Sequence, residues 1–167
     1  MTIRRDTLLC GYSFFVSIIA ITFAFYYQYI ENYPPCEFCI YQRIPYFFLI
    51  FFIPLLFFAN KFKTTFLYII PAVFLFSLVI ASVHVGIEKS FFEFSSSCSS
   101  TGEQFSDIES LRNFLDEAPI TKCNEVIWSY LGFSMAQYNS LFSLMNFAIT
   151  MFILLKKKLW KKNEYKL

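Results

Sequence analysis

The chain has 167 residues, of which 57% are apolar, 22% are aromatic and only 16% are charged. Soluble domains usually contain about 45–50% apolar and about 25% charged residues, so this composition excludes an ordinary soluble domain and a disordered chain. The formal net charge of +2 is too small to indicate a nucleic-acid-binding protein, and a small integral membrane protein forming one domain over residues 1–167 is the class that remains.

Long uncharged tracts separate the few charged zones, and each tract is long enough for one transmembrane helix. A hydrocarbon core of about 30 Å requires roughly 20 helical residues. We therefore expect an all-α membrane protein, a bundle of four transmembrane helices. The expected spans cover about residues 8–30, 40–59, 64–87 and 136–155, and the residues from Val126 to Met135 are expected to form an interfacial segment leading into the last span.

A cleaved signal peptide is the alternative interpretation of the first tract, with Arg4 and Arg5 as its basic region. The apolar part of a signal peptide usually has about 7–15 residues and ends at small residues. Here the apolar run continues from Phe23 to Tyr27 without such a site. We therefore expect the first span to be retained.

Basic residues gather on one predicted side of the membrane. The two termini and the short loop between the second and third spans contain ten Lys and Arg and two acidic residues, whereas residues 31–39 and 88–125 contain three basic and ten acidic residues. The positive-inside rule then predicts that both termini face the cytoplasm and that the loops of about residues 31–39 and 88–135 lie on the outer side.

The long outer loop is expected to contain a short amphipathic helix. The segment from Ser106 to Glu109 matches a capping box, in which the two side chains bond exposed amides reciprocally. Apolar residues then recur at helical spacing from Phe105 to Leu115. We expect this helix to lie on the membrane surface or to pack over the bundle.

Four of the five cysteines fall on the predicted outer side. Cys10 lies near the inner end of the first span, and the outer cysteines are Cys36, Cys39, Cys98 and Cys123. Disulfides persist in oxidising compartments such as the bacterial periplasm and are rare in the cytosol. Structural disulfides, a zinc site built from all four residues and redox chemistry are the interpretations open at this point.

Cys36 and Cys39 form a Cys-x-x-Cys unit, which favours redox chemistry over a structural disulfide. The stabilisation expected from a disulfide grows with the length of the loop that it closes, and this loop is very short. Paired thiols at this spacing react readily as thiolates. Pro34 and Pro35 cannot continue a helix, so we expect the second span to begin at the motif and Cys39 to lie near its N-terminus, where partial positive charge favours a negative sulfur.

Arg43 and His84 are expected at a similar depth below the outer surface. An ionisable side chain inside a span costs about 2.5–3.5 kcal/mol on insertion scales and by default marks a functional site. Arg43 lies four residues after Cys39, on the same helical face and deeper in the span, and snorkelling to the headgroups is the alternative. His84 is the only histidine of the chain, and a hydrogen-bonded core residue is its alternative. Thiols beside an apolar, cation-lined pocket predict electron transfer to a lipid-soluble acceptor such as a membrane quinone.

Three segments together resemble the disulfide bond formation protein B (DsbB) family. The segment Pro35–Arg43, with the sequence PCEFCIYQR, looks like the signature of that family. The segment His84–Glu88 is similar to the end of the family's third span. The residues that resemble the segment leading into the fourth span are Cys123, Trp128, Leu131, Gly132 and Met135.

The resemblance implies a thiol:quinone oxidoreductase of the bacterial inner membrane, with both termini cytoplasmic and the redox cysteines periplasmic. Its cofactor would be ubiquinone or menaquinone, bound at Arg43, His84 and Cys39. Its partner would be a periplasmic DsbA-like dithiol protein of the thioredoxin type. The periplasm kept oxidising by DsbA, DsbB and quinone is a general property of that pathway.

The resemblance also assigns roles to the cysteines. Cys98 and Cys123 would form the loop disulfide that the partner's thiolate attacks at Cys98. Electrons would then pass by exchange through Cys123 and Cys36, leaving Cys39 as a thiolate against the quinone ring. Cys10 matches no role in the family and is expected to be a packed small apolar residue.

Two departures from the family pattern concern the outer segments. Ala136 follows Met135 where many relatives have proline, and serines flank Cys98 where prolines are often found. The first departure affects how the interfacial segment turns into the last span. The second affects which soluble partner is preferred.

The alternatives explain fewer of the residues. A zinc site usually uses two close-spaced ligand pairs, but only Cys36 and Cys39 are close in sequence, so we expect no metal. A purely structural four-span protein leaves Arg43 unexplained. Proteins like vitamin K epoxide reductase share the chemistry, but their Cys-x-x-Cys unit lies in a late helix.

Overall fold

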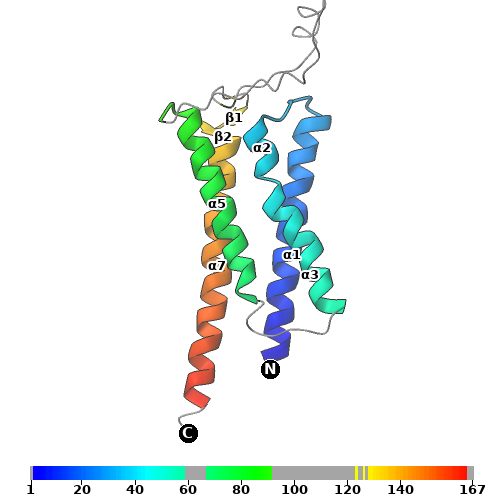
Figure 1. Cartoon of the computed structure of the whole chain (residues 1–167), viewed down its shortest axis with the longest axis vertical. Coiled ribbons are helices and arrows are strands. Elements are labelled where there is room, and N and C mark those ends of the chain that lie inside the picture. Colours follow the sequence, from blue (N-terminus) through cyan, green and yellow to red (C-terminus); the bar gives the residue numbers. More distant parts are fainter. Residues whose placement is uncertain (1, 59–66, 92–122, 124–125, 127, 165–167) are drawn as a thin grey trace, which may run out of the picture.

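The computed structural model describes residues 2–58, 67–91, 123, 126 and 128–164, which form an antiparallel helical bundle (Figure 1). Both the beginning of the first helix and the end of the last lie at one end of this bundle. In chain order the elements are α1 (Thr2–Tyr29), α2 (Glu37–Tyr41), α3 (Ile44–Phe58), α5 (Ile69–Glu88), β1 (Ser129–Tyr130), β2 (Phe133–Ser134) and α7 (Met135–Glu164).

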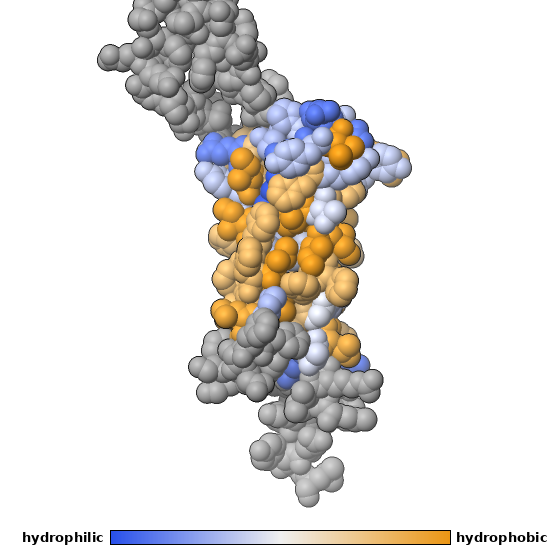
Figure 2. Space-filling view, turned by 90° about the vertical axis from the view of Figure 1, so that its right-hand side faces the viewer, coloured by the Kyte–Doolittle hydropathy of each residue, from blue (hydrophilic) through white to orange (hydrophobic). Residues whose placement is uncertain are grey.

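Within the residues that the structure describes, four helical segments are long and apolar enough to cross a membrane, which confirms the predicted fold class. They cover Asp6–Tyr29, Glu37–Leu56, Ile69–Glu88 and Met135–Lys156. Figure 2 shows a broad band of hydrophobic residues across the visible face, with hydrophilic residues gathered at its upper end. Such a band is what a helical bundle presents to lipid, because the hydrocarbon core offers no partner for polar groups.

The helices form two closely packed pairs, α1 with α3 and α5 with α7 (Figure 1). The main core lies between them, and Leu49, Ile70 and Phe74 are completely buried in it. Cys10 is also completely buried in this cluster. This confirms the prediction that Cys10 is a packed small residue.

Hydroxyl groups inside the bundle bond the backbone of their own helix. Ser17 donates to the Ser13 carbonyl at 2.8 Å, and Thr150 donates to the Asn146 carbonyl at 2.7 Å. Asn146 in turn accepts a 2.7 Å hydrogen bond from Tyr12 of α1. Because an unsatisfied polar group in hydrocarbon is costly, these contacts let polar residues occupy apolar spans.

The second crossing is interrupted after its first turns. α2 ends at Tyr41 and α3 begins at Ile44. Pro45 explains the interruption, because it has no N–H to donate to the carbonyl of Tyr41, four residues earlier. Proline is nevertheless well tolerated in the first turn of the new helix. This break was not predicted from the sequence. It separates Arg43 from the regular part of both helices.

A tight hairpin precedes α7, where only an interfacial segment was predicted. β1 and β2 pair antiparallel, with Tyr130 opposite Phe133. The two turn residues, Leu131 and Gly132, have φ values of 51° and 82°. Positive φ at both central positions is typical of a type I′ turn, whose twist matches that of the paired strands.

A capping box fixes the beginning of α7. The Ser134 backbone N–H donates to Gln137 Oε1 at 2.8 Å, and the Gln137 N–H donates to Ser134 Oγ at 3.2 Å. These reciprocal bonds satisfy amides that a helix N-terminus leaves without partners. The helix begins at Met135, directly after the hairpin. The amphipathic helix predicted around residues 105–115 lies outside the described residues, as does Cys98.

Candidate active site

Cys36 and Cys39 lie at the beginning of α2, at the end of the bundle opposite the beginning of α1 (Figure 1). Cys36 is the N-cap residue, and its sulfur accepts a hydrogen bond from the Cys39 backbone N–H at 3.2 Å. The two sulfurs lie 2.6 Å apart. Pro34 and Pro35 end the preceding extended segment, so the helix begins where the sequence predicted it.

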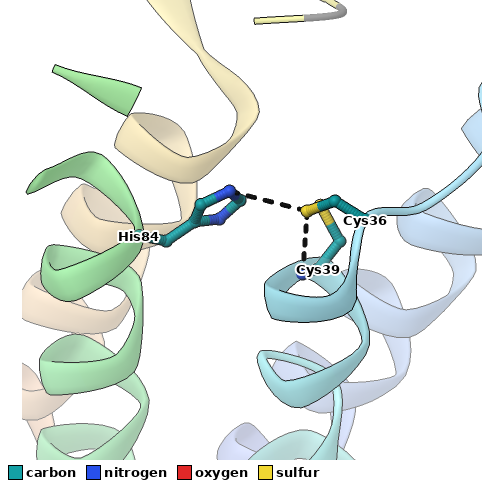
Figure 3. Close-up of side chains that lie close together, drawn as sticks. All are labelled: Cys36, Cys39 and His84. Carbon is teal, nitrogen blue, oxygen red and sulfur yellow. Dashed lines mark hydrogen bonds between the residues drawn. The ribbon is translucent and has the colours of Figure 1, made fainter. Parts of the chain in front are cut away.

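His84 approaches the cysteine pair from α5 (Figure 3). Its Nε2 atom lies 3.5 Å from the Cys36 sulfur, and its ring stacks against Phe38 with centroids 5.6 Å apart. Only 3% of its surface is exposed. His84 therefore lies directly beside the thiols.

Cys123 is the third predicted redox cysteine at this place. It packs against Cys36 and Ile87 in a small buried cluster, and its backbone hydrogen-bonds the His84 ring. The contact brings together two cysteines that are 87 positions apart in the chain.

The environment of Cys36 disfavours its ionisation. Its hydrogen bond with the Cys39 sulfur, followed by burial, raises the pKa of the Cys36 thiol. Only 4% of the Cys36 surface is exposed. When the pair is reduced, Cys36 is therefore a sulfur that retains its proton.

Arg43 points toward α1 from the break between α2 and α3. Its guanidinium donates a hydrogen bond to Gln28 Oε1 and lies over the Phe25 ring, 5.2 Å from the centroid. Both partners are neutral, so they orient the guanidinium without cancelling its charge. A fixed cation of this kind can bind an anionic or electron-rich group.

A partly open cavity of about 600 Å³ joins these residues. Cys36, Cys39, Arg43, His84 and Glu88 line it, and the rest of its wall is mostly apolar and includes residues of α1 and α7. Ile19 and Phe23 of α1 line the cavity and are also 59% and 55% exposed. The cavity therefore reaches the outer surface of the bundle within its apolar band.

Cys36, Cys39 and His84 are also the described residues that could hold a metal ion, since their ligand atoms lie within 4.8 Å of one another. This set differs from the four-cysteine zinc site considered above. Two thiolates on one tetrahedral zinc ion are about 3.8 Å apart, given Zn–S bonds of about 2.3 Å. The sulfurs here lie 2.6 Å apart, closer than such a zinc ion would hold them.

Comparison with known families bears on this site as a whole. Residues 6–153 match the family model described as "Disulfide bond formation protein DsbB". The chain belongs to the DsbB family. It is also 30% identical over 131 residues to "Uncharacterized protein RP370" of Rickettsia prowazekii (strain Madrid E), covering 77% of this chain and 76% of the relative. Membership confirms the resemblance noted from the motifs and implies a membrane oxidoreductase of disulfide bond formation.

The structure adds three polar residues to this DsbB-family site that the sequence analysis missed. Gln42, Asn139 and Tyr46 form a chain of side-chain hydrogen bonds that ends at His84. Charge marks Arg43 and His84 in the sequence, whereas these three side chains are uncharged. Amide side chains within apolar tracts could have identified them, because such groups need internal partners in a membrane.

Proposed function

We propose that this chain is a quinone-dependent protein disulfide oxidoreductase that reoxidises a periplasmic DsbA-type dithiol protein. The proposal rests on one observation: Cys36 and Cys39 lie in the wall of a largely apolar cavity that also contains Arg43 and His84. A dithiol next to an apolar cavity with a fixed cation is suited to a lipid-soluble electron acceptor.

The cavity has the size and lining that a quinone requires. Its volume of about 600 Å³ lies within the range of about 300–1,000 Å³ typical of small-molecule sites. The apolar wall suits a hydrocarbon tail, whereas Arg43 offers N–H groups to a ring oxygen and His84 lines the same cavity. When bound, a quinone supplies the capacity to accept two electrons and two protons, which is what two thiols release on forming a disulfide.

Residues of this chain would form the disulfide and orient the acceptor. Cys36 and Cys39 are close enough to join as a disulfide after a small shift. Arg43, oriented by Gln28 and Phe25, would hold an oxygen of the acceptor. The buried position of Cys36 keeps water from its sulfur.

Exchange with Cys123 would connect this pair to the soluble partner. The packing of Cys123 against Cys36 supports attack of a Cys123 thiolate on the Cys36 sulfur, which breaks the Cys36–Cys39 bond and forms a Cys36–Cys123 bond. Cys98, in the role that the family resemblance implies, would receive the partner's thiolate. Each exchange breaks one disulfide, forms another and moves two electrons.

The proposal includes the orientation in the bacterial inner membrane. The beginning of α1 and the end of α7 lie at one end of the bundle, opposite the cysteine pair (Figure 1). The basic residues flanking the spans favour a cytoplasmic position for that end. The cysteines would then face the oxidising periplasm, where disulfides persist.

Oxidation of a reduced DsbA-type protein by proteoliposomes tests the function. Turnover is expected only when ubiquinone or menaquinone is supplied, and undiminished turnover without quinone would reject the proposal. Cys39→Ser should abolish quinone reduction while permitting a trapped mixed disulfide at Cys98. Cys10→Ala, which changes a buried cysteine of the main core, is the matched control and should keep turnover. Adducts at Cys36 instead would contradict the division of roles.

A further inference from the structure

The partly buried series of side-chain hydrogen bonds from Tyr46 to His84 runs in a single direction. The Tyr46 hydroxyl donates to Asn139 Oδ1 at 2.6 Å. Asn139 Nδ2 donates to Gln42 Oε1 at 2.9 Å. Because Gln42 accepts on its oxygen, the amide nitrogen faces His84, and it lies 2.8 Å from Nδ1.

The hydrogen bonds on the other side of Tyr46 agree with this direction. The Tyr46 hydroxyl has given its proton to Asn139, so its oxygen accepts the 3.0 Å hydrogen bond with Ser143. Ser143 then accepts from Ser77, whose hydroxyl lies 3.0 Å away. Tyr46, Ser77 and Ser143 are buried, so water does not compete for these contacts.

The direction of these hydrogen bonds determines which ring nitrogen of His84 carries the proton. An amide –NH₂ group can only donate, so Nδ1 must accept and must be unprotonated in the neutral ring. The proton then resides on Nε2, the nitrogen that lies 3.5 Å from the Cys36 sulfur. This N–H faces the Cys36 sulfur and is also available to the Cys123 backbone, which hydrogen-bonds the same ring.

We propose that Gln42 and Asn139 are positioning residues that hold His84 in its Nε2–H tautomer and aim that N–H at the Cys36 sulfur. Two donors then converge on this sulfur, the His84 ring and the Cys39 backbone N–H at 3.2 Å. Donors stabilise a sulfur most when it is ionised. This inference rests on the proposed function in one respect: when the Cys36–Cys123 bond of that scheme is broken by attack of the Cys98 thiolate at Cys123, Cys36 is the sulfur that leaves with the electron pair.

The tautomer can be measured directly because His84 is the only histidine of the chain. Protein labelled with ¹⁵N-histidine, purified in lipid nanodiscs without quinone or partner, should show one neutral imidazole protonated at Nε2. We expect at least a tenfold excess over the other tautomer, the factor that corresponds to about 1.4 kcal/mol. An Nδ1–H imidazole or an even mixture in the unaltered protein would overturn the proposal.

Two variants and a matched control test the positioning role. Asn139→Leu removes the donor that fixes Gln42, and the tautomer ratio should fall toward that of free histidine in water. Gln42→Met should have the same effect and serves if the first variant does not fold. Asn146→Leu makes an identical change two turns along α7 in a residue that bonds Tyr12 and should leave the ratio unchanged. An unchanged ratio in folded Asn139→Leu protein would contradict the proposal.

A second readout concerns the sulfur itself. In a Cys39→Ser background, alkylation of Cys36 at a fixed pH should be about tenfold slower with Asn139→Leu than with Asn146→Leu. Equal rates would show that the aimed N–H does not act on Cys36. Neither measurement uses quinone or a soluble partner, so failure of the proposed function leaves both outcomes interpretable, and failure of the tautomer test leaves the quinone assay intact.

Discussion

The Tyr46 hydroxyl of α3 donates a hydrogen bond to the Asn139 side chain of α7 across 2.6 Å, although 93 residues separate the two in the chain. The bond joins the α1–α3 pair to the α5–α7 pair at the inner wall of the cavity. Only 3% of Tyr46 is exposed. We expect a hydrogen bond between the two helix pairs to contribute to the free energy of unfolding and to the geometry of the site.

Tyr46→Phe tests that contact. It leaves Asn139 Oδ1, which is half-buried, without this donor, and a fully buried group left unsatisfied costs about 1–3 kcal/mol. We expect the free energy of unfolding in detergent to fall by about 1–2 kcal/mol. Tyr41→Phe removes an exposed hydroxyl that bonds Glu37 at 2.7 Å and should change stability by less than about 0.5 kcal/mol. Equal effects of the two changes would contradict the proposed weight of the buried bond.

Arg43→Gln tests the proposed role of the cavity cation. The change removes the charge from a side chain oriented by Gln28 and Phe25. Hydrogen bonds to charged groups are worth about 1.5–3 kcal/mol, so the KM for quinone should rise about tenfold or more. Lys89→Gln, which removes an exposed charge at the end of α5, is the control. A KM equally affected by both changes would indicate a general effect of surface charge.

The raised pKa of Cys36 predicts how its alkylation depends on pH. The hydrogen bond with Cys39 and burial keep the Cys36 thiol protonated at a pH where an ordinary thiol, with a pKa near about 8.5, is half ionised. Alkylation of Cys36 in the reduced protein should therefore begin only at higher pH. Cys39→Ser removes the larger cause, so the alkylation profile should move to lower pH. Peptide mass spectrometry of Cys36 after timed alkylation measures both profiles, and an unmoved profile would be contrary evidence.

The hairpin turn before α7 predicts two changes of opposite sign. Leu131 has a φ of 51° and is 78% exposed, so it bears left-handed strain without packing. Leu131→Asn should raise stability by about 0.5–1 kcal/mol, because asparagine tolerates this conformation better. Gly132→Ala, at a φ of 82°, should lower stability by about 1 kcal/mol. Thermal unfolding of the two variants checks the signs, and two shifts in the same direction would refute the turn assignment.

Features that depend on one segment at a time could be predicted from the sequence. The four apolar helices follow from charge-free tracts and the thickness of a bilayer. The helix that begins after Cys36 follows from Pro34 and Pro35, which cannot extend it backwards. The depth of His84 follows from counting helical rise from the end of its tract, although its contact with Cys36 was not specified.

Features that depend on how helices face one another could not be predicted. The chain from Tyr46 through Asn139 to Gln42 requires a particular rotation of α3 against α7, and hydropathy does not fix rotation. Pro45 indicates the break before α3, but the uncharged tract alone predicts a continuous helix. The hairpin has strands of only two residues, too short for any alternation to show.

The exposed positions of Ile19 and Phe23 in the cavity wall would give the proposed quinone a route from the lipid. A molecule that reaches Cys39 past these side chains need never pass through water. Occupancy is then governed by the mole fraction of ligand in the lipid and by diffusion in two dimensions. Saturation of the site then depends on the ratio of ligand to lipid in the bilayer. Adding inert lipid lowers this ratio even when the volume of the sample stays constant.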